Sequence, residues 1–275
     1  MLRPMPNHGL PIARSTDHKV RVVLLRLLLI VMVGATSATT LRLFASETAN
    51  KITVPTEFEC RRATGPIKLD GRADEPAWTN AVVIETFVAY WTNRPARTKT
   101  KARLLWDEDS LYFHAELEDA DLYANVREEN GRTWDDDVFE LFFRPDESSS
   151  NYYEFEVNAL NTHFNKLFPP RGNNGPGRFT NSRAFRWKTA VKLDGTLNHR
   201  QDHDNGWTVE GRIPWSDFAP TGGKPKVGET WRFALCRYDY SKNFDGPDLS
   251  SCAPLQSLSF HRYVDYCRLR FAAAP

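Results

Sequence analysis

The feature that most constrains the fold of this chain is a succession of short apolar segments separated by turn-forming residues. From about residue 54 the segments are rich in aromatic and β-branched side chains, and clusters of Asp, Asn, Gly, Ser and Pro divide them. Only EPAWTNA and WSDF suggest a turn or two of helix. The pattern predicts an all-β domain over residues 54–273, an antiparallel two-sheet β-sandwich. The segments are ARLLWD, SLYFHAELED, DVFELFFRPD, YYEFEVNAL, RWKTAVKLDG, GWTVEGRIPW, TWRFALCRYDY and CRLRF.

The beginning of the chain has the layout of a signal peptide. Basic residues precede the run LLLIVMVGATSA, which is apolar and then fades into small residues. The apolar run is shorter than the roughly 20 residues that a membrane-spanning helix needs. We therefore expect a signal peptide over residues 1–38, with cleavage as late as residue 49 as an alternative, and a linker over residues 39–53. This predicts a secreted, periplasmic or cell-envelope protein without a membrane span in the mature chain, and a retained anchor is the alternative.

The charge balance argues against nucleic acid as a partner. Residues 1–38 contain five basic residues and one acidic residue, so the remainder has 36 − 5 = 31 basic and 35 − 1 = 34 acidic residues. A net charge near −3 lacks the basic footprint of a nucleic-acid binder.

Four cysteines, Cys60, Cys236, Cys252 and Cys267, lie in the part of the chain expected to be exported. In an oxidising compartment they allow one or two disulfides, and buried free thiols are the alternative. None of them forms a CxxC pair, which argues against a structural zinc site.

The stretch RTWDDDVFELFF, residues 132–143, and the following YYEFEVNAL predict a β-hairpin. Side chains alternate between the faces of a strand, so the hairpin brings Glu140 roughly opposite Glu156 and places Asn158 toward Trp134. These four side chains should share one exposed sheet face. An indole beside hydrogen-bonding groups suits a sugar ring, and a solvated sheet face with one exposed tryptophan is the alternative.

The other tryptophans have structural explanations. Trp78, Trp106, Trp207 and Trp231 occur in apolar, alternating contexts and are predicted to be core or sheet-edge residues. Trp91, in AYWTNRP, is predicted to lie in a loop, where it can extend a binding surface.

Five motifs in order resemble the family 9 carbohydrate-binding modules. They are IKLDGRADEPAW, ARLLWDEDSLYFHAELEDADL, TWDDDVFELFF, YYEFEVNALNT and GWTVEGRIPW, and the resemblance extends over about residues 54–273. It implies a β-sandwich of the CBM9/DOMON-like kind, structural calcium in some members, and a cleft that holds sugars at glycan ends between two aromatic side chains.

The resemblance also assigns roles to particular residues. Trp134 matches the first stacking tryptophan of the family, and Glu140 matches its hydrogen-bonding glutamate. Asn158 falls on the asparagine of the family's strand.

Two positions depart from the family pattern. Characterised members have an arginine where this chain has Glu156. The second stacking tryptophan is expected shortly before the last strand, where SLSFHRYVDYCRLRF offers the smaller Phe260, with His261 beside it. The departures concern the sugar that is bound, whereas the fold does not depend on them.

Carboxylates that can bind calcium are concentrated in WDEDS and EDAD and in the aspartate run of TWDDD. Calcium prefers such oxygen ligands, but these segments lack the spacing of an EF-hand loop, and turn formation is the alternative. The metal candidates are Asp107, Asp109, Asp119, Asp121 and Asp137.

A glycosidase would need two carboxylates on either side of the scissile bond, and Glu140 with Glu156 would be the first candidates. The expected open face offers no cleft to raise the pKa of one of them. We therefore predict carbohydrate binding without catalysis and without a required cofactor. A domain of the same fold that serves as an envelope or protein-interaction module is the alternative. Whether a partner glycoside hydrolase is involved does not follow from the sequence.

Overall fold

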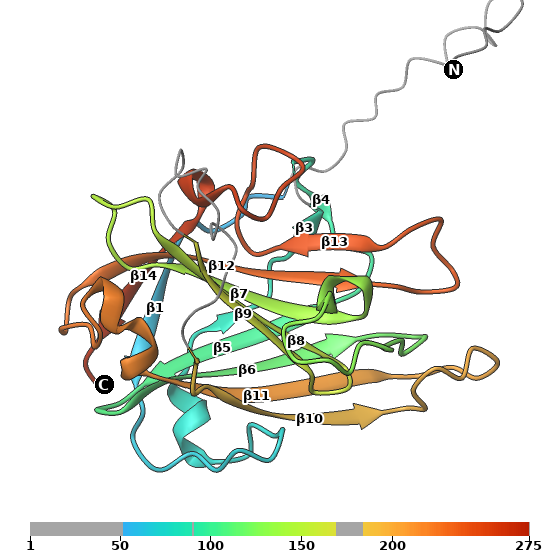
Figure 1. Cartoon of the computed structure of the whole chain (residues 1–275), viewed down its shortest axis with the longest axis horizontal. Coiled ribbons are helices and arrows are strands. Elements are labelled where there is room, and N and C mark those ends of the chain that lie inside the picture. The colour runs from blue at the N-terminus through green and yellow to red at the C-terminus, as the bar shows by residue number, and fades with distance from the viewer. Residues whose placement is uncertain (1–51, 90, 169–183, 275) are drawn as a thin grey trace, which may run out of the picture. The chain divides into compact units, whose positions relative to one another are not determined.

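The computed structural model describes residues 52–89, 91–168 and 184–274 (Figure 1). The predicted signal peptide and most of the predicted linker lie outside these residues. The described part is built from short 3₁₀ helices and strands. The helices are η1 (Pro76–Asn80), η2 (Thr133–Asp135), η3 (Trp215–Thr221) and η4 (Tyr263–Asp265). The strands are β1 (Glu57–Arg62), β2 (Val83–Ile84), β3 (Val88–Ala89), β4 (Arg94–Pro95), β5 (Thr100–Trp106), β6 (Ser110–Glu118), β7 (Val138–Arg144), β8 (Tyr152–Asn158), β9 (His163–Phe168), β10 (Lys188–Asp194), β11 (Gly206–Pro214), β12 (Thr230–Asp239), β13 (Asp248–Ser251) and β14 (Cys267–Ala272).

The all-β prediction is confirmed. Each of the eight apolar segments forms a strand, namely β5, β6, β7, β8, β10, β11, β12 and β14, and the two short helical segments become η1 and η3. Within the described residues, no helix has the length and apolarity required to cross a bilayer.

Hydrogen bonds join the strands in the order β10-β11-β6-β5-β1-β14-β12-β13-β3-β4, and β7, β8 and β9 extend from β12. In Figure 1, β5, β6, β11 and β10 lie side by side below β7 and β12. The pairing is mainly antiparallel, but β1 runs parallel to both of its neighbours, β14 and β5. The expectation of a purely antiparallel arrangement is therefore wrong at this seam. The described strands form one continuous hydrogen-bonded network, and its division into two sheets stays a prediction.

The core forms between the inner faces of these strands, as the alternation in the sequence predicts. Phe139, Leu141 and Phe143 of β7 are completely buried, and so are the inward-facing residues of β8. The ring of Phe113 on β6 lies 6.3 Å from that of Phe139, between centroids. Burial of one such side chain contributes about 2–3 kcal/mol. This core fixes which face of β7 and β8 points away from it.

The tryptophans of the apolar segments are core residues. Trp78, Trp106, Trp207 and Trp231 are all buried, which confirms the prediction. Trp91 is 47% exposed and follows β3.

All four cysteines are buried free thiols. This structure therefore has four unbridged cysteines and none of the disulfides that the sequence allowed. Burial raises the pKa of the Cys60 and Cys236 thiols well above the usual value. These two side chains act as small apolar groups of the core.

Candidate functional site

The hairpin of β7 and β8 has the predicted register. Glu140 pairs directly with Glu156, and Val138 pairs with Asn158 at the end near η2. On the far side of β8, Phe164 of β9 pairs with Glu156. Because paired residues point to the same face, these carboxylates and the Phe164 ring lie together on the face opposite the core.

This outer face is covered, contrary to the expectation of an exposed surface. The segment that follows β13 brings Leu258, Ser259, Phe260 and His261 over the strands and encloses a pocket of about 520 Å³. Glu140 is consequently only 2% exposed. The cover comes from residues more than a hundred positions away from the hairpin, which local alternation does not reveal. The pocket is lined by Trp134, Glu140, Glu154, Glu156, Phe164, Lys166, Phe168, Tyr238, Leu249, Leu258, Ser259, Phe260 and His261.

Aromatic rings form much of the pocket wall. Trp134, held by η2, is half-buried, and its ring packs edge-on against Phe164 at 5.3 Å between centroids. Phe260 is buried and packs edge-on against Tyr238 at 5.4 Å. Both residues predicted as stacking plates therefore line the same pocket. Phe260 is only 5% exposed and belongs to the hydrophobic core, so the half-buried Trp134 supplies more of the surface on which a sugar ring can stack.

Three glutamates form the polar part of the pocket. One carboxylate oxygen each of Glu140, Glu154 and Glu156 lies within 4.8 Å of the others, and all three residues are buried. Burial raises the pKa of Glu156 to about 8, although the Thr133 hydroxyl, which donates to this carboxylate, opposes the rise. Burial, followed by repulsion from the neighbouring carboxylates, raises the pKa of Glu140 and of Glu154 well above the usual value.

Two basic side chains line the pocket beside Glu154. Lys166 on β9 pairs with Glu154 across the strands, and its charge partly offsets the upward shift of the Glu154 pKa. His261 places its Nε2 atom 3.9 Å from Glu154 Oε1, while its Nδ1 atom lies 3.2 Å from the Tyr152 hydroxyl. His261 therefore lies in the pocket as predicted, and Tyr152 helps to position its ring.

Asn158 does not line the pocket. Its side-chain amide donates to the Val126 carbonyl and to Asp136, and its carbonyl oxygen accepts from the backbone N–H groups of Leu160 and Thr162. All of its hydrogen-bonding capacity is used within the protein. These contacts argue against a ligand-binding role for Asn158, which stays a prediction, and the residue ties the end of β8 to two loops.

The aspartate run before β7 also serves the backbone. Asp136 accepts from the N–H groups of Asn125 and Val126, and Asp137 accepts from those of Tyr123 and Tyr240. These bonds fix the chain that carries Trp134 into the pocket.

Some of the predicted metal candidates converge on a second acidic cluster. Asp119, Asp137 and Asp239 place carboxylate oxygens within 4.8 Å of one another, and all three are buried. Burial and the charge of Asp239 raise the pKa of Asp119 to about 6. The Arg237 guanidinium pairs with Asp119 and Asp239, each at 3.1 Å.

One oxygen each of Asp121 and Asp239 is buried without a hydrogen-bond partner. Orphaned carboxylate oxygens and an excess of negative charge over Arg237 fit a hard cation such as calcium. Sequence reasoning missed Asp239 because it lies on β12, far along the chain from the other aspartates.

Asp107 and Asp109 lie apart from this cluster. Asp107 accepts hydrogen bonds from the backbone N–H groups of Asp109 and Ser110 and from the Tyr112 hydroxyl. These bonds hold the turn that leads the chain into β6. The contacts of Asp107 favour the turn alternative, and the metal role of Asp107 and Asp109 stays a prediction.

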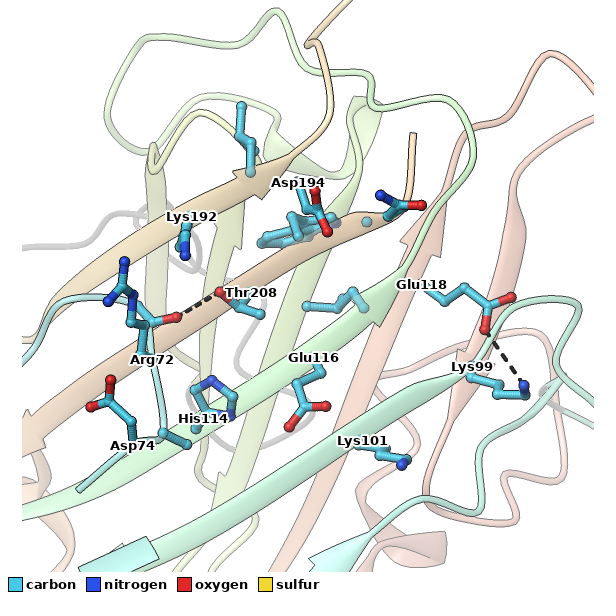
Figure 2. Close-up of a pocket in the computed structure, with 17 residues that line it drawn as sticks. Arg72, Asp74, Lys99, Lys101, His114, Glu116, Glu118, Lys192, Asp194 and Thr208 are labelled. Atoms are coloured by element: carbon cyan, nitrogen blue, oxygen red, sulfur yellow. Dashed lines mark hydrogen bonds and ion pairs between the residues drawn. The ribbon is translucent and has the colours of Figure 1, made fainter. Parts of the chain in front are cut away.

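A larger and more open groove, of about 830 Å³, crosses the outer face of β10, β11, β6 and β5 (Figure 2). Figure 2 shows His114 and Glu116 of β6 directed into it beside Thr208 of β11. Thr208 donates to the Gly71 carbonyl, and Lys99 pairs with Glu118. Trp207 lines this groove but is only 2% exposed, so the groove offers less aromatic surface than the smaller pocket and is a poorer site for a sugar ring.

Sequence reasoning missed several residues of the pocket. Glu154 follows from the same alternation that identified Glu156, and Phe164, Lys166 and Phe168 alternate along HFNKLF, the segment that forms β9. That alternation is the signal from which these three residues can be found. Tyr238 and Leu249 join the pocket only through the tertiary fold.

Residues 69–248 match a family described as "Carbohydrate family 9 binding domain-like". This chain belongs to that family. The family 9 match contains the β7–β8 hairpin, Trp134 and all three pocket glutamates, whereas Phe260 and His261 lie beyond it.

Curated relatives include long enzymes that contain a matching segment. Endo-1,4-beta-xylanase A of Thermotoga maritima is 31% identical over 158 residues, which are 56% of this chain and 12% of the xylanase. Endo-1,4-beta-xylanase C of Paenibacillus barcinonensis is 33% identical over 111 residues, or 39% of this chain and 10% of that enzyme. The match thus spans about a tenth of the length of these relatives.

Solved structures share the fold at low sequence identity. A crystal structure from Bacteroides uniformis has a TM-score of 0.63 and 18% identity, and the match covers 78% of this chain and 99% of that one. A family 9 carbohydrate binding module from Caldicellulosiruptor kristjanssonii, in complex with cellotriose, has a TM-score of 0.54 and 18% identity, with 80% and 95% coverage. These likenesses establish the family 9 fold.

Proposed function

We propose that the domain binds carbohydrate, at a glycan or a glycan end, in the pocket beneath Phe260, and that it does so without catalysing a reaction. The observation that carries the proposal is the enclosure of aromatic faces and buried carboxylates in one pocket of about 520 Å³. Membership of family 9 supports this assignment.

The pocket offers both contacts that a sugar ring needs. The C–H faces of the ring pack on the aromatic walls, Trp134 and Phe260, while the hydroxyl groups donate to Glu140 and Glu156. Each hydroxyl exchanges a hydrogen bond with water for one with protein, so the net gain per bond is only about 1 kcal/mol. We therefore expect dissociation constants on the order of micromolar to millimolar.

The electrostatics of the glutamates argue against hydrolysis. A retaining glycosidase needs one ionised and one protonated carboxyl group about 5 Å apart. Here burial raises the pKa of Glu140, Glu154 and Glu156 together. The directions of these shifts therefore do not single out one ionised nucleophile beside one protonated acid.

We further propose that the network of strands packs as a two-sheet sandwich and that the protein is exported. The ring contact between Phe113 of β6 and Phe139 of β7 supports two facing layers. The apolar run near the start of the sequence supports export. The matching segments in xylanases support a glycoside hydrolase as the partner of this domain.

The test is a glycan array followed by calorimetry with the full chain, including xylan and cellulose oligosaccharides. Trp134→Ala should weaken binding of any hit about five- to thirtyfold, because stacking on one aromatic face contributes roughly 1–2 kcal/mol. Trp91→Ala is the matched control, since this exposed tryptophan does not line the pocket and its replacement should leave the affinity unchanged.

A hit that survives Trp134→Ala would place binding elsewhere. Absence of any hit with folded protein would contradict the proposal and favour a protein-interaction module of the same fold. Release of reducing sugar from any bound oligosaccharide would contradict a purely binding role.

A further inference from the structure

Carboxyl groups outnumber basic side chains in the pocket where the structure describes it. Among the described lining residues, three carboxylates, those of Glu140, Glu154 and Glu156, face two basic side chains, Lys166 and His261. Both basic side chains lie beside Glu154. Among the residues that the structure describes, no cation pairs with Glu140 or Glu156 across the strands.

Glu140 is the least satisfied of the three. Thr133 donates to Glu156, and His261 and Lys166 approach Glu154, but no hydrogen bond or ion pair from the described residues reaches the Glu140 carboxylate. Its side chain is 98% buried, yet it lines the pocket. Burial and the neighbouring carboxyl groups raise the pKa of Glu140 and so favour its protonated form in the ligand-free pocket. A cationic ligand that donates to Glu140 favours the ionised form and supplies the missing charge partner.

We propose that the pocket selects saccharides that carry an ammonium group, that is, amino sugars with a free amine, over neutral sugars of the same shape. The inference rests on the proposed carbohydrate-binding function and names the class of ligand. The ammonium group donates to Glu140 and Glu156, while the ring that carries it stacks on Trp134. A hydrogen bond between charged partners is roughly twice as strong as one between neutral groups.

The composition of the walls favours an ammonium group over a metal ion. Calcium requires six to eight oxygen ligands. Beyond the three glutamates, the walls are mainly rings and aliphatic groups, such as Phe164, Phe168, Phe260 and Leu249. Aromatic faces attract an organic cation, with a gain of about 0.5–2 kcal/mol.

Three trisaccharides with the same β-1,4 linkage make a matched test, because they differ only in the substituent at C2. They are the trimer of glucosamine, its N-acetylated form, and cellotriose. Calorimetry of the full chain at pH 7 and low salt should give at least about tenfold tighter binding of the glucosamine trimer than of cellotriose, with protons released to the buffer as the ammonium group ionises the glutamates. The N-acetylated trimer should bind no more tightly than cellotriose, because it has lost the charge.

Variants assign the preference to the pocket. Glu140→Gln keeps the size of the side chain and should reduce the preference for the glucosamine trimer to less than about threefold. Glu128→Gln, an exposed glutamate outside the pocket, should leave the preference intact. A thermal melt of each variant verifies that it is folded. A full preference in Glu140→Gln would overturn the assignment.

The remaining outcomes separate the inference from the proposed function. If cellotriose binds as tightly as the glucosamine trimer, the inference is wrong and the carbohydrate-binding function stands. If none of the three trisaccharides binds to folded protein and the glycan array is also blank, the proposed function itself fails. If EDTA abolishes binding of all three, calcium restores it, and the same response persists in Asp239→Asn, a metal ion occupies the glutamates and the inference is overturned.

Discussion

Replacement of Glu156 by glutamine should stabilise the ligand-free protein, and increasingly so as the pH rises. Burial raises the pKa of this carboxyl group from 4.5 to about 8. The folded state therefore binds the proton more tightly than the unfolded state does. The corresponding stability is fully present below pH 4.5 and is lost progressively as the pH rises toward about 8. Glutamine has no proton to lose and keeps the neutral form throughout this range.

The size of the effect follows from the interval between the two pKa values. The difference of about 3.5 pH units corresponds to about 5 kcal/mol at 1.36 kcal/mol per unit. Glu140 and Glu154 share the pocket with Glu156, so the three carboxyl groups share the free-energy cost of ionisation. Removing one of them relieves between a third of this cost and all of it. We expect Glu156→Gln to gain about 2–5 kcal/mol in the free energy of unfolding at pH 8.5 and close to nothing at pH 4.5.

Urea denaturation of both proteins at four pH values and constant ionic strength measures this difference. Other buried acids, such as Asp119, also titrate in this range, but they are present in both proteins and cancel in the comparison. Glu128→Gln is the control, because this exposed glutamate does not face the pocket. A difference between wild type and Glu156→Gln that stays constant from pH 4.5 to pH 8.5 would refute the reasoning.

Two further predictions concern residues outside the sugar pocket. Asn158→Ala should reduce the free energy of unfolding by about 2–4 kcal/mol, because four buried hydrogen bonds are lost. Calorimetry of the folded variant should find unchanged sugar affinity. A selective loss of affinity would return Asn158 to the binding site. In a thermal melt, calcium at a hundredfold excess over its Kd should raise Tm by roughly 5–10 °C relative to the protein in EDTA. Asp239→Asn should abolish this shift. The same Tm with calcium and with EDTA would exclude a stabilising calcium ion.

The hairpin shows how much of the site is encoded locally. The spacing of apolar residues and the length of the turn determine which side chains face each other across the strands, and so the pairing of Glu140 with Glu156 could be predicted. Local alternation also identified Trp78, Trp106, Trp207 and Trp231 as core residues. Both results depend only on residues close together in sequence.

The rest of the site depends on contacts that local patterns do not contain. The alternation makes the outer face of the hairpin polar, which resembles a solvated surface, but Phe260 and His261 return from a distant segment to cover it. The alternation of side chains along β8 places Asn158 on the face where a ligand-binding residue is expected. Only the tertiary structure shows that two loops use all of its hydrogen bonds.

The parallel seam has a consequence for the time course of folding. Strand β1 lies between β5 and β14, and β14 begins 205 residues after β1 ends, from Arg62 to Cys267. A ribosome that adds 5–20 residues per second needs roughly 10–40 s to make that stretch. Throughout this interval β1 has an unpaired edge, so the domain cannot close before its last strand has been synthesised. We expect such a nascent chain to remain unfolded long enough to be threaded through a translocation channel, and to depend on holding chaperones in the meantime.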